Sequence, residues 1–230
     1  MPVLAVSERG CVTVTSGTAL RRLKSTHLHR AELPDEHVSH KDNFALTEPT
    51  RTVLDVARER GVEAGLVAAD FALHENLSTR ESLAAVSLFC RSWPGVRSAR
   101  FVASFADGRA ESPLESLSRL RMHRSGLAVP ELQPLILDAY GVVIARCDFY
   151  WDEFGVVGEA DGRLKYAVGG SSIVEEKRRQ KALEDAGLVV VRWEWQDLGS
   201  FTSVARRLEA AFVRGYPPGS PLRRWTAVPS

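Results

Sequence analysis

Cysteine is scarce in this sequence, and its positions argue against the sites that depend on it. The three cysteines, Cys11, Cys90 and Cys147, are odd in number and far apart. A disulfide framework or a cysteine-built zinc site is therefore not expected. No apolar run approaches the roughly 20 residues that span a bilayer, and the first residues are too short and uncharged for a signal peptide. We expect a cytoplasmic protein with no membrane partner.

An excess of either charge is also missing. Thirty basic and 29 acidic side chains leave a net charge of +1, so any surface that binds nucleic acid must be local. Hydrophobic residues make up 44% of the chain and charged residues 26%, as in ordinary globular proteins. The length is sufficient for one large or two small domains, each with its own core.

Histidines cluster near the N-terminus without a metal-binding pattern. His27, His29, His37 and His40 lie close together, but their spacing matches no zinc template and no cysteine lies nearby. We do not expect a metal site there.

The first half of the chain changes from short strands to helices at about residue 47. Pro49 follows a capping sequence, and apolar residues then repeat at helical spacing as far as Gly61. The same features predict three more helices, over residues 63–76, 79–91 and 94–105. The polar turn at 107–110 predicts a boundary, so residues 1–108 form a mainly helical N-terminal domain with short strands.

The second half has the pattern of an α/β domain over residues 109–214, followed by a proline-rich tail over 215–230. The expected helices cover residues 112–125, 172–186 and 198–214, and the expected strands cover 132–137, 142–151, 156–161 and 188–191. A strand, a helix and a strand apolar throughout form a βαβ crossover. We therefore expect a mixed sheet flanked by helices, with an antiparallel meander and one added parallel strand.

Two acidic residues are expected to face each other across a hairpin. If Trp151 pairs with Val156, the register places Asp148 opposite Glu159. Two carboxylates roughly 5 Å apart repel each other unless something neutralises them. Hard oxygen ligands that converge from two strands suit Mg²⁺ or Mn²⁺. The hairpin therefore predicts a metal site, provided that the register holds.

The same register pairs Arg146 with Asp161 on the face that holds Asp148 and Glu159. This pair can be a cross-strand ion pair, which we favour, or Asp161 can be a further metal ligand. The opposite face is then apolar and includes Phe149 and Trp151, so we expect it to be the core face.

Four segments together resemble a known nuclease superfamily. They are Ser112–Ser116, Glu159–Tyr166, Glu176–Arg179 and Val190–Trp193. Asp148, ten intervening residues, and then Glu159-Ala160-Asp161 resemble the PD-(D/E)XK pattern. The combination is similar to actinobacterial AbiEi-antitoxin-like proteins related to very-short-patch-repair endonucleases. The resemblance implies a restriction-endonuclease-like α/β fold for the second half of the chain.

The resemblance also implies roles for single residues. In that superfamily, residues at the positions of Asp148 and Glu159 bind Mg²⁺, and Glu115 is placed to complete the metal site. A lysine normally stands where this chain has Asp161. The resemblance implies a migrated catalytic lysine, for which we favour Lys177 and then Lys165.

Several of these residues also have structural interpretations. Glu115 is the third residue after Ser112 and can complete a capping box. The basic side chains of the predicted crossover helix can contact DNA phosphates or pair with acids on a solvated helix face. The candidate DNA-contacting residues are Arg163, Arg178, Arg179 and Lys181.

These observations favour a Mg²⁺- or Mn²⁺-dependent DNA endonuclease or nickase. The alternative is an antitoxin-like, DNA-binding transcriptional regulator that keeps the fold without catalysis, with a toxin or a second copy as a further partner. Trp193 and Trp195 flank the end of the buried strand. Packing in the core is their expected role, and stacking on DNA bases is the alternative.

Overall fold

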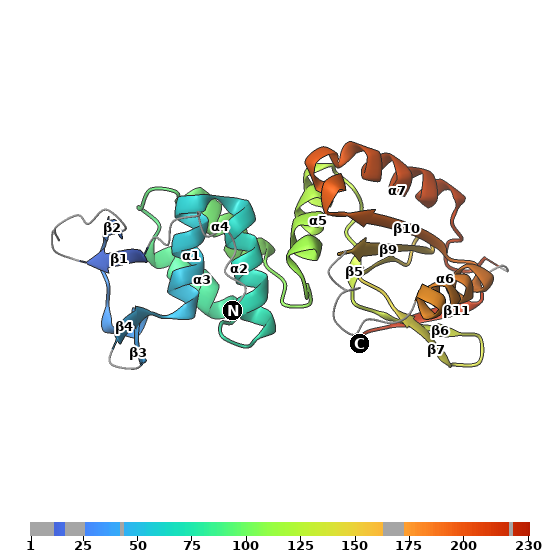
Figure 1. Cartoon of the computed structure of the whole chain (residues 1–230), viewed down its shortest axis with the longest axis horizontal. Coiled ribbons are helices and arrows are strands. Elements are labelled where there is room, and N and C mark those ends of the chain that lie inside the picture. The colour runs from blue at the N-terminus through green and yellow to red at the C-terminus, as the bar shows by residue number, and fades with distance from the viewer. Residues whose placement is uncertain (1–11, 17–25, 42–43, 163–172, 221–222) are drawn as a thin grey trace. The chain divides into compact units, whose positions relative to one another are not determined.

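The computed structural model describes residues 12–16, 26–41, 44–162, 173–220 and 223–230 (Figure 1). The chain divides into two compact units, Met1–Gly108 and Arg109–Ser230, and the division falls within the polar turn at 107–110. In the part of the chain that the structure describes, no helix has the length and apolar character needed to cross a membrane.

The N-terminal unit combines short strands with a helical bundle, as the sequence predicts. Strands β1 (Val12–Ser16) and β2 (Thr26–Arg30) pair in parallel, and β3 (Val38–Lys41) pairs antiparallel with β4 (Phe44–Thr47). A short 3-10 helix, η1, covers Asp35–His37. The bundle helices that pack on one another are α1 (Pro49–Arg60), α2 (Val62–His74), α3 (Arg80–Phe89) and α4 (Val96–Phe105).

Local sequence explains where the bundle helices begin and end. Pro49 occupies the first turn of α1, and Gly61, with a φ of 85°, ends that helix. Thr79 caps α3 by accepting a hydrogen bond from the Ser82 amide. A Cβ atom on Gly65 would lie 2.4 Å from the Cβ of Ala57, so α1 and α2 require glycine at this contact.

A buried arginine joins the segment around η1 to the bundle. Arg51 on α1 is fully buried and forms an ion pair with Asp55 at 2.8 Å. Its Nη1 donates to the Glu32 carbonyl at 3.2 Å and lies 3.2 Å from His37 Nδ1. The guanidinium also lies 4.7 Å from the centre of the Trp93 ring. These contacts offset part of the free-energy cost of burying the charged guanidinium group.

The C-terminal unit is a mixed α/β domain. Its helices are α5 (Pro113–Arg124), α6 (Ile173–Ala186), the 3-10 helix η3 (Trp195–Ser200) and α7 (Thr202–Arg214). Its strands are β5 (Glu131–Leu132), β6 (Leu135–Asp138), β7 (Val143–Arg146), β8 (Phe149–Trp151), β9 (Val156–Asp161), β10 (Val189–Glu194) and β11 (Trp225–Val228).

The strands form two sheets that share one bent hairpin. The four-stranded sheet has the order β10-β9-β8-β5, and the three-stranded sheet has the order β11-β6-β7. Strand β10 pairs in parallel with β9 after the α6 crossover, as predicted. Figure 1 shows α7 over one face of the four-stranded sheet, with α6 and the smaller sheet on the other face. Both faces of the four-stranded sheet are therefore covered.

One prediction about the strands is wrong. Residues 142–151 do not form one strand, because the chain bends at Cys147 and Asp148 between β7 and β8. The face that carries Asp148 and Glu159 is covered as well as the apolar face. Tyr150 and Val157 are buried there in a second core beneath α6, because the smaller sheet and α6 cover that face.

The prediction of a terminal tail is also wrong. Strand β11 pairs antiparallel with β6, and Trp225 is buried. Its indole Nε1 donates to the Tyr150 hydroxyl at 2.7 Å. Arg223 forms an ion pair with Asp152 in the β8–β9 turn. Three of the prolines of this segment precede the strand and Pro229 follows it, so none of them interrupts its pairing.

Candidate functional site

The β8–β9 hairpin has the predicted register. Trp151 pairs with Val156, and Phe149 pairs with Gly158. The next position of this register brings Asp148, immediately before β8, opposite Glu159 on β9. Asp148 Oδ2 accepts a hydrogen bond from the Ala160 amide at 2.8 Å, which fixes its carboxylate beside Glu159.

Glu159 is a deeply buried acid. The residue is 3% exposed, and its Oε2 accepts a hydrogen bond from Arg179 Nη2 at 3.1 Å. Among the described residues, Oε1 has no hydrogen-bond partner of suitable geometry, although the weakly donating thiol of Cys147 lies close to the carboxyl group. Burial and the charge of Asp148 raise the pKa of Glu159 to about 7, against the opposing effect of Arg179. The Glu159 carboxyl group therefore populates both its protonated and its ionised form near neutral pH.

Arg179 is the basic residue of α6 that contacts Glu159. Its Nη1 also donates to the Arg146 carbonyl at 3.1 Å, so the guanidinium joins β9 to the end of β7. Lys177, favoured from the sequence, has an exposed side chain, as do Arg178 and Lys181.

Helical spacing could have identified Arg179. Leu183 and Ala186, which are buried positions in the part of α6 whose side chains the structure describes (residues 177–186), follow it by four and seven residues. These spacings place Arg179 on the helix face that packs on the sheet, and they place Lys177 and Arg178 away from it.

Glu115 has the structural contacts of a capping residue. It is buried, and its Oε1 accepts a hydrogen bond from Ser112 Oγ at 2.6 Å. Its Oε2 accepts hydrogen bonds from the Glu111 amide at 3.0 Å and from Gln133 Nε2 at 2.8 Å. The Glu115 amide in turn donates to Ser112 Oγ. The carboxylate therefore fastens the start of α5 to the bend next to Asp148.

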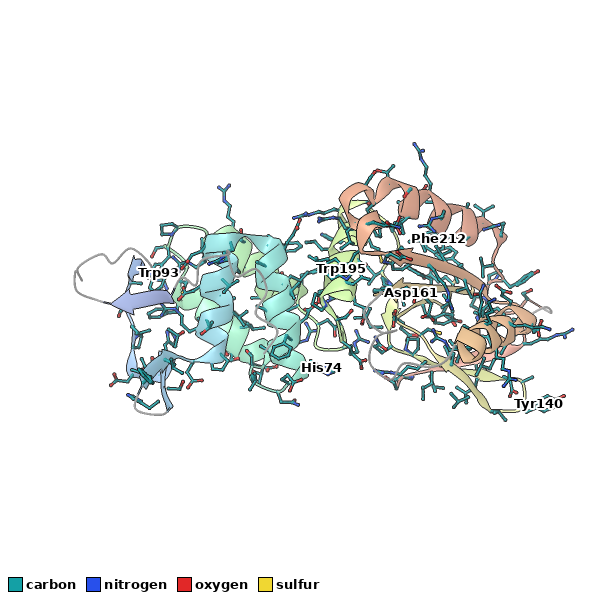
Figure 2. All side chains as sticks on the ribbon, viewed as in Figure 1. His74, Trp93, Tyr140, Asp161, Trp195 and Phe212 are labelled. Carbon is teal, nitrogen blue, oxygen red and sulfur yellow. The ribbon has the colours of Figure 1, made fainter. Side chains whose placement is uncertain are left out.

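Arg146 and Asp161 do not face each other, and the prediction that they form an ion pair is wrong. The bend at Cys147 places Arg146 in the three-stranded sheet opposite Leu135, where its guanidinium forms an ion pair with Glu111. Asp161 lies at the end of β9 (Figure 2), with one carboxylate oxygen 3.7 Å from Arg192 Nη1 on β10.

The described part of the site offers a metal two carboxylates rather than a full cage. Among the residues that the structure describes, no group of three acidic, histidine or cysteine side chains is arranged to hold a metal ion. Mg²⁺ commonly binds through one or two protein carboxylates and fills its shell with water and substrate phosphates. Glu159 Oε1, which has no strong hydrogen-bond donor among the described residues, and the neighbouring Asp148 fit that kind of site. Lys165 and Arg163 lie outside the described residues.

Comparison with known proteins identifies relatives without a stated function. Two uncharacterized proteins, from two strains of Mycobacterium tuberculosis, are each 32% identical to the chain over 174 residues. The match covers 74% of this chain and 64% of the length of each relative. No family model matches the chain, and no solved structure matches it.

The two tryptophans at the end of β10 differ in environment. Trp193 is buried, and its Nε1 donates to Ser118 Oγ at 2.7 Å. Trp195, labelled in Figure 2, is 45% exposed. It follows Glu194, which pairs with Asp161 in the β9–β10 register. Core packing therefore accounts for Trp193 and leaves Trp195 at the edge of the sheet where β9 ends.

Proposed function

We propose that the C-terminal unit is a Mg²⁺- or Mn²⁺-dependent DNA endonuclease or nickase centred on Asp148 and Glu159. The observation that supports this most strongly is the buried Glu159 carboxyl group beside Asp148. One of its oxygens is bonded to Arg179, and the other has no hydrogen-bond partner of suitable geometry among the described residues. A buried acid whose pKa is perturbed by burial and by a neighbouring charge is typical of functional sites.

The residues of this unit divide the tasks of phosphodiester hydrolysis among them. Asp148 and Glu159 would hold the cation, and a bound divalent cation supplies polarisation of the phosphate and a more acidic water. Arg179 holds the Glu159 carboxylate in place and balances part of the acidic charge. Its guanidinium stays protonated at neutral pH, so it serves for orientation and charge and not as a base.

DNA is proposed as the substrate from charge and from the resemblance to PD-(D/E)XK nucleases. Lys177, Arg178 and Lys181 are exposed on α6, the helix that carries Arg179 to the acids. Exposed basic side chains on one helix can contact successive phosphates. The antiparallel β8–β9 hairpin followed by the α6 crossover agrees with the proposed restriction-endonuclease-like fold.

A non-catalytic, antitoxin-like DNA-binding regulator is the second candidate, with a toxin or a second copy as partner. Two observations favour it. Asp161 stands where the resembling nucleases have lysine, and Arg179 already neutralises one oxygen of Glu159. Such a protein would use the same basic helix to bind DNA and would not cleave it.

A cleavage assay with Mg²⁺ or Mn²⁺ separates the two candidates. Supercoiled, linear, mismatched and single-stranded DNA should be tested with the full chain and with Asp148→Asn and Glu159→Gln. Both substitutions keep side-chain size and remove the charge that holds the cation. We expect cleavage or nicking by the parent protein and a loss of at least 100-fold in each variant, since transition-state charge is no longer stabilised.

Glu153→Gln is the matched control, because Glu153 is an exposed acid in the turn of the same hairpin. It should leave cleavage unchanged. Undiminished cleavage in Asp148→Asn and Glu159→Gln would contradict the proposed site. DNA binding without cleavage of any form by the parent protein would favour the regulator.

A further inference from the structure

The long hairpin of the C-terminal unit bends sharply without losing its register. On one side of the bend Leu132 pairs with Phe149, and on the other side Leu135 pairs with Arg146. The same register therefore runs through the bend and places Gln133 opposite Asp148. The backbone amide of Gln133 donates to the backbone carbonyl of Asp148 at 3.2 Å, so these two residues stay connected where the regular strand pairing is interrupted.

Pro134 and Cys147, the next two opposed residues in the bend, are also joined by a backbone hydrogen bond. Cys147 donates its amide hydrogen to the Pro134 carbonyl at 3.1 Å. Pro134 has no amide hydrogen to return, which explains why regular pairing stops there. The bend directs β5 and β8 into the four-stranded sheet and β6 and β7 into the three-stranded sheet.

Gln133 has an unusual backbone conformation for its residue type. Its φ is 56°, in the left-handed region, and it is one of two such non-glycine residues in the part of the chain described. This region is unfavourable for residues with a Cβ atom, and strained backbone of this kind gathers at functional sites. Glycine or asparagine would adopt this backbone more easily, so the presence of glutamine requires a reason in its side chain.

The Gln133 side chain supplies that reason. The residue is 4% exposed, and its Nε2 donates to Glu115 Oε2 at 2.8 Å. Glu115 is also held by Ser112 and by the Glu111 amide. Gln133 therefore connects the capped start of α5 with the backbone of Asp148.

The orientation of Asp148 depends on this connection. From the bend, its Oδ2 reaches the Ala160 amide on β9 at 2.8 Å, next to Glu159. If Asp148 were shifted by one position toward β7, its side chain would point away from the face that carries Glu159, because side chains alternate between the two faces of a strand. The backbone position that Gln133 holds therefore determines where the Asp148 carboxylate points.

We propose that Gln133 is a positioning residue that holds Asp148 in the orientation needed to share a divalent cation with Glu159. This inference rests on the proposed function and extends it to a residue that does not itself touch the cation. Removing the Gln133 amide side chain should loosen the Asp148–Ala160 contact and weaken cation binding, even where the fold is retained.

Gln133→Asn and Gln133→Gly test the proposal in the full chain. Both residues accept the left-handed backbone, and neither reaches Glu115, so the protein should stay folded. Gln180→Ala is the control, because Gln180 also donates a side-chain hydrogen bond to a glutamate, Glu184, at 2.8 Å on α6.

The first readout is the Ala160 amide in metal-free protein, measured by NMR. Loss of its hydrogen bond should shift the amide proton upfield and speed its exchange with solvent in both Gln133 variants. The Val157 amide, on the same strand within the regular ladder, should not change. The second readout is Mn²⁺ affinity, which should fall about 10-fold or more, as is typical when a residue supporting a metal ligand is lost.

The outcomes distinguish the positioning role from the function of the site. An unchanged Ala160 amide with unchanged Mn²⁺ affinity in both folded variants would overturn the proposal. If the Ala160 amide depends on Gln133 but the parent protein binds no Mn²⁺, Gln133 positions Asp148 and the metal-dependent function is wrong. A loss of Mn²⁺ affinity equal to that of Gln180→Ala would also overturn the proposal.

Discussion

At Glu159, two arginines oppose the effects of burial and of the neighbouring acid on the pKa. Burial and Asp148 favour the protonated acid, whereas Arg179 and Arg192 favour the carboxylate. The balance raises the pKa from its ordinary value of 4.5 to about 7. A cation placed beside both acids would reverse this balance and release the proton, so cation affinity should increase with pH through this range.

Glu159 should make the C-terminal unit less stable as the pH rises. The folded state binds the proton more tightly than the unfolded state, so stability is lost as the pH increases from 4.5 to about 7. The loss is on the order of 3 kcal/mol. Glu159→Gln should remove this dependence. Melting temperatures of parent and variant should therefore converge near pH 4.5 and separate by pH 8 in metal-free buffer, with the variant higher. Parallel pH profiles would contradict the assigned pKa.

Arg179 should matter for stability more than its exposed neighbour. Arg179→Ala leaves a buried carboxylate without its cation and should lower the free energy of unfolding by about 1–3 kcal/mol at pH 8. The loss should shrink at pH 5, where Glu159 is protonated. Arg178→Ala is the control and should change little, because that side chain is exposed. Urea unfolding at the two pH values measures both effects, and equal losses in the two variants would contradict the contact.

At the level of elements, alternation and spacing explain what the sequence can predict. The Trp151–Val156 pairing was predicted because side chains alternate on both strands of a short hairpin. The bend at Cys147 and Asp148 was not predicted. Its partner residue Gln133 has a left-handed backbone, and glutamine, unlike glycine, does not indicate such a conformation in a sequence. Arg179, and not Lys177, is the basic residue of α6 that contacts Glu159, and the four-residue spacing between Arg179 and the apolar Leu183 could have indicated this.

Strand β11 was not predicted from the sequence, because the strand is short and the proline-rich residues before it are typical of a terminal tail. Trp225 should nevertheless be one of the larger contributors to stability in the C-terminal unit, since it packs in the core and bonds to Tyr150. Trp225→Ala should cost about 3–5 kcal/mol. Thr226→Ala, at an exposed position of the same strand, should cost under about 0.5 kcal/mol. Thermal unfolding compares the two, and similar small losses would show that β11 does not support the fold.

For the whole molecule, the two units should respond to acid in opposite ways. Burial, followed by the charge of Arg51, lowers the pKa of His37 in the N-terminal unit. That unit should lose stability as the pH falls below about 6.5, because unfolding allows His37 to bind a proton. The C-terminal unit should gain stability over the same range through Glu159.

Hydrogen exchange at pH 7 and pH 5 can follow each unit separately in the full chain, once rates are corrected for the intrinsic effect of pH. Protection should decrease in α1 and increase in β9 on acidification. His37→Gln should remove the first change and leave the second. A uniform change across both units would contradict this account.

The location of bound Mn²⁺ tests the central claim most directly. Crystals of the full chain grown at pH 8 with Mn²⁺ should be measured by anomalous diffraction. We predict one anomalous peak within coordination distance of Asp148 and of Glu159 Oε1, absent in crystals of Glu159→Gln. No peak at these residues at millimolar Mn²⁺, with Glu159 still paired to Arg179, would contradict the assignment of a metal-dependent active site.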